Sequence, residues 1–210
     1  MPDSILTVTV AATVRNLAEL VSVKAELDLG DGADGADLLR RIRAVSTAID
    51  RFCGRTLARE TLQEVVRPVR ALDVLVLSRY PVASITSIVA DGATLVAGTD
   101  FEADLETGRI WRLSGDVRCC WRCRKITALY AAGYLLPGQV GANLPEDITR
   151  ACIVAVTASY QAKGRDPLLR SEASQDVGQK SYMDPRAHSS GLPPQAIDLL
   201  RDGGYVSVRV

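Results

Sequence analysis

The chain has 210 residues, 47% of them hydrophobic, and its 25 Lys and Arg residues balance 25 Asp and Glu residues. This composition can bury the core of one domain or of two small ones, and the neutral balance argues against tight, non-specific nucleic-acid binding by the chain alone. The sequence opens without the basic segment and apolar run of a secretory signal, and five cysteines without disulfide-scaffold spacing fit a reducing compartment such as the cytoplasm.

The N-terminal residues predict a strand or arm followed by a helix. Residues 5–10 alternate partly between apolar and polar side chains, as in a short strand. Asn16 and Glu19 have the spacing of a capping box, and Leu20 and Leu27 follow at helical intervals. We therefore expect a first helix that opens at Asn16.

A second helix is predicted after a loop rich in Gly and Asp at residues 30–35. That loop lacks the alternating ligands and terminal glutamate of a calcium site, which favours a linker. The helix carries apolar side chains at steps of four and three residues: Leu38, Ile42, Val45, Ile49 and Phe52. Its opposite face holds Arg40, Arg41 and Arg43. A solvated face explains these arginines, and a surface facing DNA or a partner is the alternative.

The middle of the chain predicts a sheet. Short apolar runs with a period of two indicate strands at residues 62–66, 74–77, 85–89 and 109–113, and Asp91-Gly92 indicates a hairpin. An acidic segment precedes a basic one, and their charged residues are Asp100, Glu102, Asp104 and Glu106, then Arg109 and Arg112. Cross-strand ion pairs account for this pattern.

A long helix is predicted from Pro145 to Lys163. Proline suits a first helical position, and acidic residues in the first turn complement the helix dipole. The helix is apolar around nearly its whole circumference, so other helices or another subunit must cover it. It is too short and too interrupted by Thr and Ser for a membrane span. Val154, Val156 and Tyr160 are the candidates for a subunit interface.

The C-terminal part predicts an extended, mobile loop at residues 164–191 and then a short amphipathic helix opened by two prolines. The apolar residues of that helix include Ile197, Leu199 and Leu200. Residues 205–210 alternate like a strand with no later sequence to pair with. This tail either extends a partner's sheet or folds back as an edge strand on its own sheet.

The sequence offers little catalytic chemistry. The cluster from Cys119 to Cys123 contains one Cys-x-x-Cys pair, Cys120 and Cys123, which could be half of a zinc site. The remaining ligands would have to come from Cys53, Cys152 and His188, which lie in a helix end, a buried helix and a loop. With one histidine, neither a Ser-His-Asp relay nor a two-histidine metal site can be assembled. We predict no catalytic residue, no metal and no cofactor.

Several segments together resemble the head-tail connector, or adaptor, proteins of tailed bacteriophages and gene transfer agents. They are residues 16–20, 48–55, 80–85, 130–134 and 144–148. The resemblance covers most of residues 16–200, whereas the cysteine cluster around Cys120 has no counterpart in it. It implies a helical bundle that carries a β-rich insertion.

We therefore predict an α+β protein: a small helical bundle with a β-rich insertion and an extended C-terminal segment. Residues 1–56 would form an N-terminal arm and two bundle helices, and residues 57–130 the β-rich insertion. Residues 131–202 would hold the long helix, the loop and the short helix, and residues 203–210 the tail.

The resemblance implies a structural adaptor without enzymatic activity, located in the neck of a virion or phage-like particle assembled in the bacterial cytoplasm. About a dozen copies would form a ring under the portal and join head to tail around the DNA channel. The partners would be other copies, the portal protein and a tail-side connector or stopper protein. DNA would pass through the lumen without sequence-specific binding, and no membrane would be involved.

In the resembling family the C-terminal part often engages the portal. We therefore expect portal binding from Ile197, Leu199, Leu200, Tyr205, Val206, Val208 and Val210. From the sequence itself we expect Arg40, Arg41 and Arg43 to face the channel or a partner. The alternative function is a small hydrolase or carbohydrate-binding module that uses the sheet, because paired carboxylates such as Asp100 and Asp104 are available.

Overall fold

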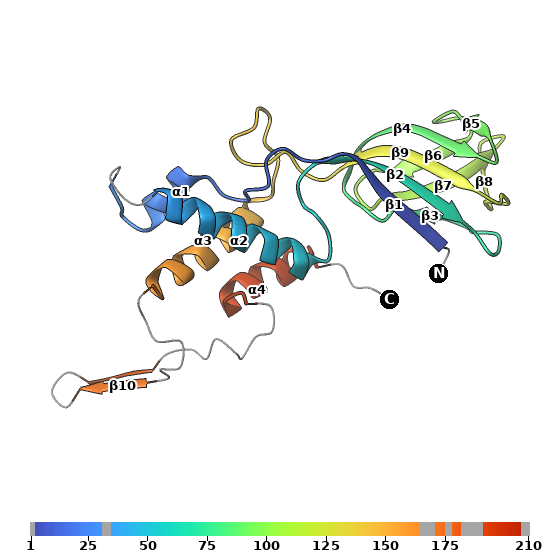
Figure 1. The fold of residues 1–210 in the computed structure, drawn as a ribbon. Coiled ribbons are helices and arrows are strands. Elements are labelled where there is room, and N and C mark those ends of the chain that lie inside the picture. Colours follow the sequence, from blue (N-terminus) through green and yellow to red (C-terminus); the bar gives the residue numbers. More distant parts are fainter. Residues whose placement is uncertain (1–2, 31–34, 164–170, 175–177, 182–190, 207–210) are drawn as a thin grey trace. The chain divides into compact units, whose positions relative to one another are not determined.

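The chain folds into two compact units, one built from strands and one from helices. The computed structural model describes residues 3–30, 35–163, 171–174, 178–181 and 191–206. The β unit comprises residues 1–14 and 56–135, and the helical unit residues 15–55 and 136–210 (Figure 1). The predicted α+β class is confirmed.

The β unit contains two antiparallel sheets. The five-stranded sheet has the order β1-β2-β9-β4-β5. Its strands are β1 (Asp3–Val10), β2 (Glu60–Arg67), β9 (Ile126–Ala132), β4 (Val82–Ala90) and β5 (Ala93–Leu95). The second sheet has the order β3-β7-β6, with β8 also paired to β7. Its strands are β3 (Leu75–Val76), β7 (Arg109–Ser114), β6 (Phe101–Asp104) and β8 (Val117–Cys119).

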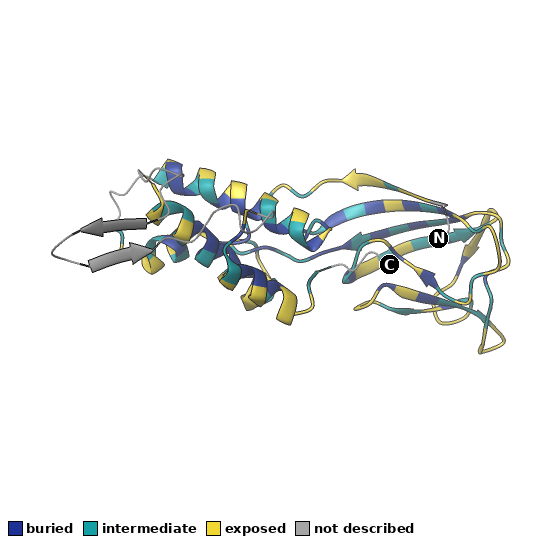
Figure 2. Ribbon diagram, turned by 90° about the horizontal axis from the view of Figure 1, so that it is seen from below, coloured by how far each residue is buried: buried dark blue, intermediate teal, exposed yellow. Residues whose placement is uncertain are grey.

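The two sheets share one core. Burial alternates along β2 and β9, as expected for strands with one face turned inward (Figure 2). Leu62 and Ile88 of the five-stranded sheet belong to the same buried cluster as Phe101 and Ile110 of the other sheet. Trp121, which is 1% exposed, completes this core. The strands predicted at residues 62–66, 74–77, 85–89 and 109–113 are thus confirmed.

The turns follow the predicted chemistry. Asp91 and Gly92 connect β4 to β5 with φ values of 48° and 92°. Positive φ at both residues is the geometry of the tight hairpin turn for which Asp-Gly is favoured. The Asp91 carboxylate also accepts hydrogen bonds from the backbone N–H groups of Arg124 and Lys125, each 2.9 Å from Oδ1. This tie fixes the hairpin to the segment that enters β9.

The N-terminal segment is a strand, but it does not belong with the helices. β1 pairs antiparallel with β2 along its length, from Asp3 opposite Arg67 to Val10 opposite Thr61. Residues 1–14 therefore join the β unit, and the predicted boundary, which grouped residues 1–56, is revised.

The helical unit contains α1 (Leu20–Glu26), α2 (Gly35–Cys53), α3 (Glu146–Gln161) and α4 (Pro194–Asp202). α3 packs against the other three helices. The predicted stripe of α2 is buried at Leu38, Ile42 and Ile49. Among the described residues no helix combines the length and apolar character that a bilayer crossing requires.

Two predictions about the helical unit are wrong. The first helix begins at Leu20 rather than at Asn16, and Glu19, its N-cap residue, makes no side-chain capping bond. Leu17 and Ala18 are buried instead, and the Leu17 N–H donates to Ser46 Oγ at 3.0 Å. Within the expected C-terminal loop, β10 (Ser171–Ser174) and β11 (Gly178–Ser181) pair antiparallel. The rest of residues 164–190 lies outside the described part of the chain.

Candidate functional site

A buried carboxylate lies at the centre of the β unit. Glu64 of β2 is 1% exposed and accepts four hydrogen bonds. Ser4 Oγ donates to Oε1 at 3.0 Å and Ser78 Oγ at 2.5 Å. The Ser78 N–H donates to Oε2 at 3.0 Å and the Tyr130 hydroxyl at 2.7 Å. Burial, with the neighbouring carboxylate, raises the pKa of the Tyr130 phenol above its ordinary range. These hydrogen bonds connect β1, β2, β9 and the segment that follows β3, which fits a structural role.

The acidic strand is occupied by contacts within its own sheet. Asp100 pairs with Arg112 at 3.3 Å, which confirms a predicted cross-strand ion pair, and Glu102 pairs with Arg118 at 2.9 Å. The Val96 N–H, followed by Arg112, lowers the pKa of Asp100, and the Thr107 hydroxyl lowers the pKa of Asp104. These carboxyl groups therefore stay ionised at neutral pH. Neither Asp100 nor Asp104 therefore resembles a general acid.

The cysteine cluster lines an open depression of ≈ 490 Å³ in the β unit, together with Arg112 and Trp121. Cys119, Cys120 and Cys123 are each half-buried. The Cys120 thiol donates to Asp73 Oδ1 at 3.1 Å, and this bond raises the pKa of Cys120. Within the described part of the chain, no three His, Cys, Asp or Glu side chains are arranged to hold a metal ion. His188 lies outside the described residues.

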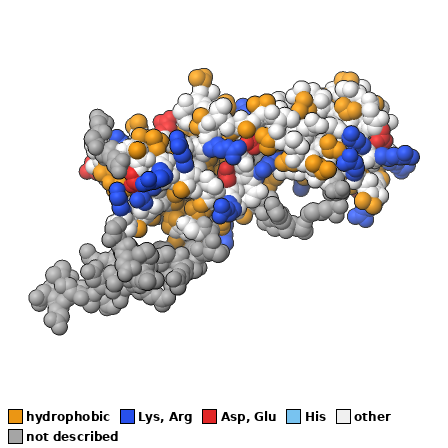
Figure 3. Space-filling model, viewed as in Figure 1, with side chains coloured by type: hydrophobic (Ala, Val, Ile, Leu, Met, Phe, Trp, Pro, Cys, Tyr) orange, Lys and Arg blue, Asp and Glu red, His pale blue; other side chains and the backbone are white. Residues whose placement is uncertain are grey.

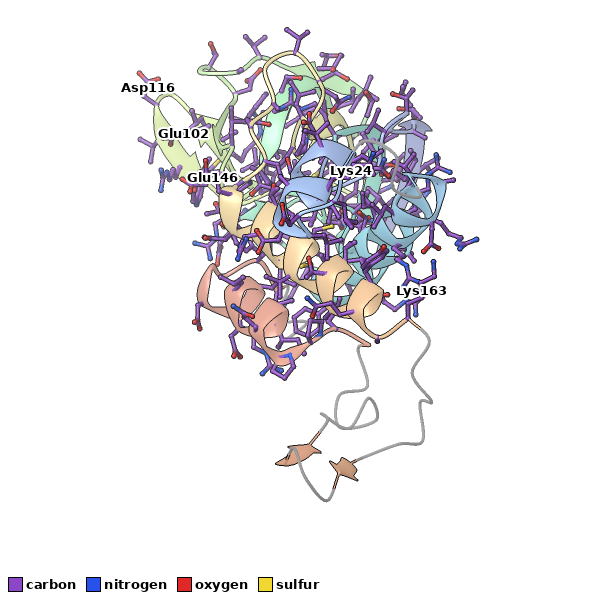
Figure 4. The ribbon with its side chains drawn as sticks, turned by 90° about the vertical axis from the view of Figure 1, so that its left-hand side faces the viewer. Lys24, Glu102, Asp116, Glu146 and Lys163 are labelled. Carbon is purple, nitrogen blue, oxygen red and sulfur yellow. The ribbon has the colours of Figure 1, made fainter. Side chains whose placement is uncertain are left out.

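A charged cluster joins α2 to the end of α3. Asp37, 5% exposed, binds Arg40, Arg41 at 3.1 Å and Lys163 at 3.3 Å. Lys163 lies just past the end of α3 (Figure 4). Arg41 also donates to the Ser159 carbonyl and hydroxyl oxygens, both at 2.7 Å. The hydrogen bonds from Arg41 and then Arg40 lower the pKa of Asp37 to about 2.

The contacts of this cluster limit which of the arginines predicted to face the channel or a partner can form a free basic surface. Arg41 is committed to the contact between α2 and α3, so it does not belong to a free basic surface. Arg40 is 78% exposed although it pairs with Asp37, and Arg43 is exposed. On the face shown in Figure 3, each of the two units carries basic side chains.

Of the residues predicted for a subunit interface, two remain accessible. Val154 and Tyr160 are half-buried. Val156 is 0% exposed within its own chain, because α3 is covered by its neighbouring helices, so its assignment to a subunit interface is wrong.

The residues predicted to bind the portal also include both buried and accessible side chains. Ile197 and Leu200 are buried, because the apolar stripe of α4 packs against α3, and they are not available to a partner. Leu199, Tyr205 and Val206 are half-buried, and neither Tyr205 nor Val206 lies in a strand. Val208 and Val210 lie outside the described residues.

Both units can be compared with solved structures at nearly full length. No protein-family model and no curated protein matches the chain. A chain from the neck of an empty gene transfer agent (GTA) particle, computed with C6 symmetry, is 21% identical with a TM-score of 0.58. A chain from the virion of a native GTA particle is 19% identical with a TM-score of 0.58, and one from the native neck computed with C12 symmetry is 20% identical with a TM-score of 0.55.

The chain has the fold of these particle proteins. Each comparison covers 98% of this chain and 97% of the other. The likeness therefore includes the β unit as well as the helices, and the predicted resemblance in fold is confirmed. At this level of identity the likeness concerns the fold, and it transfers no individual site residue.

One candidate surface, the outward face of the five-stranded sheet, was not predicted from the sequence. Strands β4, β5 and β9 contain no charged residue, and the two glutamates of β2, Glu60 and Glu64, are buried on the inner side of the sheet. The outward face of the five-stranded sheet is consequently uncharged between its ends. The signal was present as runs without Asp, Glu, Lys or Arg, at residues 82–90, 92–99 and 126–132.

Proposed function

We propose that the chain is a structural head-tail connector in the neck of a phage-like particle of the gene transfer agent type. The observation that carries this proposal is the likeness to chains of GTA particles over 98% of this chain and 97% of theirs. A chance resemblance of one common module would cover only one of the two units. Here the sheet and the helical bundle recur together.

The proposal extends to the finer architecture of the neck. Necks computed with C6 and C12 symmetry contain repeated copies, which supports a ring of about a dozen subunits for this chain. In this ring the subunits would contact the portal protein on the head side and a connector or stopper protein on the tail side. DNA would pass through the lumen without sequence-specific contacts, consistent with equal numbers of basic and acidic residues.

The contacts in the β unit favour this role over a hydrolase or carbohydrate-binding module. Asp100 and Glu102 are held in ion pairs, and Glu64 already accepts four hydrogen bonds. A carboxylate that holds strands together is poorly placed to bind substrate or transfer a proton. These three carboxylates thus have a structural explanation.

The C-terminal tail remains the proposed contact with the portal. Ile197 and Leu200 anchor α4 inside the helical unit. The segment that follows, beginning with the half-buried Tyr205 and Val206, would then be presented from a fixed base. A weak contact repeated in every subunit of a ring would give strong attachment through avidity.

Gene deletion in cells that produce the particle tests this function. We expect filled heads without tails, and restoration of tailed particles by the full chain but not by a chain lacking residues 203–210. Circular dichroism of the purified truncated chain serves as the control for folding. Tailed, infectious or gene-transferring particles from the deletion strain would contradict the proposed function. Full rescue by the truncated chain would contradict only the role of the tail.

A further inference from the structure

The two outward faces of the β unit differ in charge. On the five-stranded sheet, Ile5, Val65, Thr127 and Val89 lie opposite one another across successive strands. The next outward row contains Thr7, Gln63, Leu129 and Ser87, and a third contains Val10, Thr61, Ala131 and Ser84. None of these side chains is charged.

The outward face of the other sheet has the composition of a solvated surface. Glu102 and Arg118 form an ion pair there at 2.9 Å, and the Arg118 guanidinium lies 4.2 Å from the centre of the Trp111 ring. Asp104 is directly opposite Arg109 in the register. One β unit therefore has a charged face suited to water and an uncharged face on which most side chains are β-branched or small. Charge depletion of this kind distinguishes the centre of protein interfaces from the remaining surface.

The uncharged face continues to an unprotected edge at β1. Ile5, Val8 and Val10 are 53%, 45% and 61% exposed. Residues 4–14 contain no charged residue and no proline, so β1 lacks the lysines and prolines that commonly prevent edge pairing. A bulge between Val8 and Val10 interrupts only one end of the strand.

The opposite edge of the same sheet has a similar composition. β5 spans Ala93–Leu95, and residues 92–99 contain no charged residue. Thr94 is exposed on the outward side, opposite Val89, and Val96 is 59% exposed. A sheet with two different uncharged edges can contact a second copy head to tail. Repetition of one such contact generates a ring, whereas pairing of β1 with β1 would close a dimer.

We infer that the uncharged face and β1 edge of the five-stranded sheet bind the β5 side of a second copy of this chain, forming the subunit contact of the ring. This inference rests on the proposed function, because the repeated copies in the C6 and C12 necks are the reason for choosing a second copy as the partner. Two neutral surfaces from one chain are also compatible with each other without unpaired charges.

Lysine substitutions on the two sheets provide a matched test. Ile5 of β1 and Val76 of β3 are both 53% exposed, both β-branched and both on edge strands of the β unit. Ile5→Lys places a charge within the inferred contact, and Val76→Lys places the same charge on the solvated sheet. Thr94→Lys charges the opposing β5 edge. Native mass spectrometry of the full-length proteins over a concentration series would measure assembly, with circular dichroism to verify folding.

The wild type and Val76→Lys should assemble at the same concentration. Ile5→Lys and Thr94→Lys should each need at least about tenfold more protein, because the contact would bury an unpaired ammonium group. The inference would be overturned if Ile5→Lys or Thr94→Lys assembled at the wild-type concentration. It would also be overturned if Val76→Lys needed the same increase in protein concentration as these two variants.

Two further outcomes separate this inference from the proposed function. If the wild-type protein remains monomeric at every concentration, the inferred self-association is wrong. The connector function would still stand if the deletion strain produced heads without tails. If Ile5→Lys assembles normally but produces heads without tails, the edge of β1 contacts another neck protein. That result would overturn the inference and leave the connector function in place.

Discussion

Replacement of Tyr130 by phenylalanine tests the buried centre of the β unit. The Tyr130 side chain is 0% exposed, and phenylalanine keeps its ring while removing the hydroxyl that donates to Glu64 at 2.7 Å. A hydrogen bond to a charged group contributes about 1.5–3 kcal/mol net. Since Ser4 and Ser78 still donate to the carboxylate, we expect the lower half of that range, about 2 kcal/mol of unfolding free energy.

The chain contains a convenient probe for this measurement. Its two tryptophans, Trp111 and Trp121, both lie in the β unit, so urea unfolding followed by tryptophan fluorescence reports on this unit. Tyr160→Phe is the control, because Tyr160 is half-buried in the helical unit, and its fluorescence transition should stay within about 0.5 kcal/mol of the wild type. An unchanged transition for Tyr130→Phe would refute the argument that this centre holds the strands together.

Three further comparisons of variants test separate features. Val156→Asp should cost at least about 3 kcal/mol of unfolding free energy, because Val156 is 0% exposed and the new charge would be buried without a partner. Val154→Asp should cost clearly less, because Val154 is half-buried. Thermal unfolding would show equal losses for the two variants if α3 were oriented otherwise. Asp37→Asn should destabilise the chain at pH 7. Because the folded pKa of Asp37 is lowered to about 2, the difference from wild type should persist above about pH 4 and shrink towards pH 2 in pH-dependent denaturation. A pH-independent difference would rule out this ion-pair contribution. Gly133→Ala should cost at least about 2 kcal/mol more than Gly92→Ala in the same denaturation assay: both glycines have positive φ, but only at Gly133 would the new Cβ lie 2.6 Å from a backbone oxygen. Equal costs would exclude that clash.

Elements defined by local patterns could be predicted from the sequence. The stripe of α2, the Asp91-Gly92 hairpin and the alternating strands all depend on periodicity or turn chemistry within a few residues. The capping-box prediction at Asn16 failed because tertiary packing decides there. Leu17 is buried and its N–H bonds to Ser46, which holds the segment outside the helix.

Long-range partners could not be predicted. The alternating residues of β1 indicated a strand, but nothing in them specified pairing with β2 about 60 residues later, so the segment was placed in the wrong unit. The apolar stripe of α4 likewise has the same appearance whether it packs on its own chain or on a partner. The structure places Ile197 and Leu200 inside the helical unit. The hairpin of β10 and β11 contains few apolar residues, and hydrophobic periodicity therefore gave no indication of it.

The candidate surfaces also depend on long-range contacts that the sequence does not specify. Charges in sequence suggested Arg41 as a free basic residue, whereas its guanidinium bridges Asp37 and Ser159. The runs without charged residues that form β4 and β9 were visible in the sequence. Their significance as one continuous outward face depends on strand order and register, which arise only from the fold.

Electron cryo-microscopy of purified particles from the producing cells would test the connector function most directly. Reconstruction of the neck should contain density between head and tail that accommodates both units of this chain in repeated copies around the DNA axis, and particles from the deletion strain should lack that density. Density for this chain elsewhere in the particle, or an unchanged neck in the deletion strain, would contradict the account.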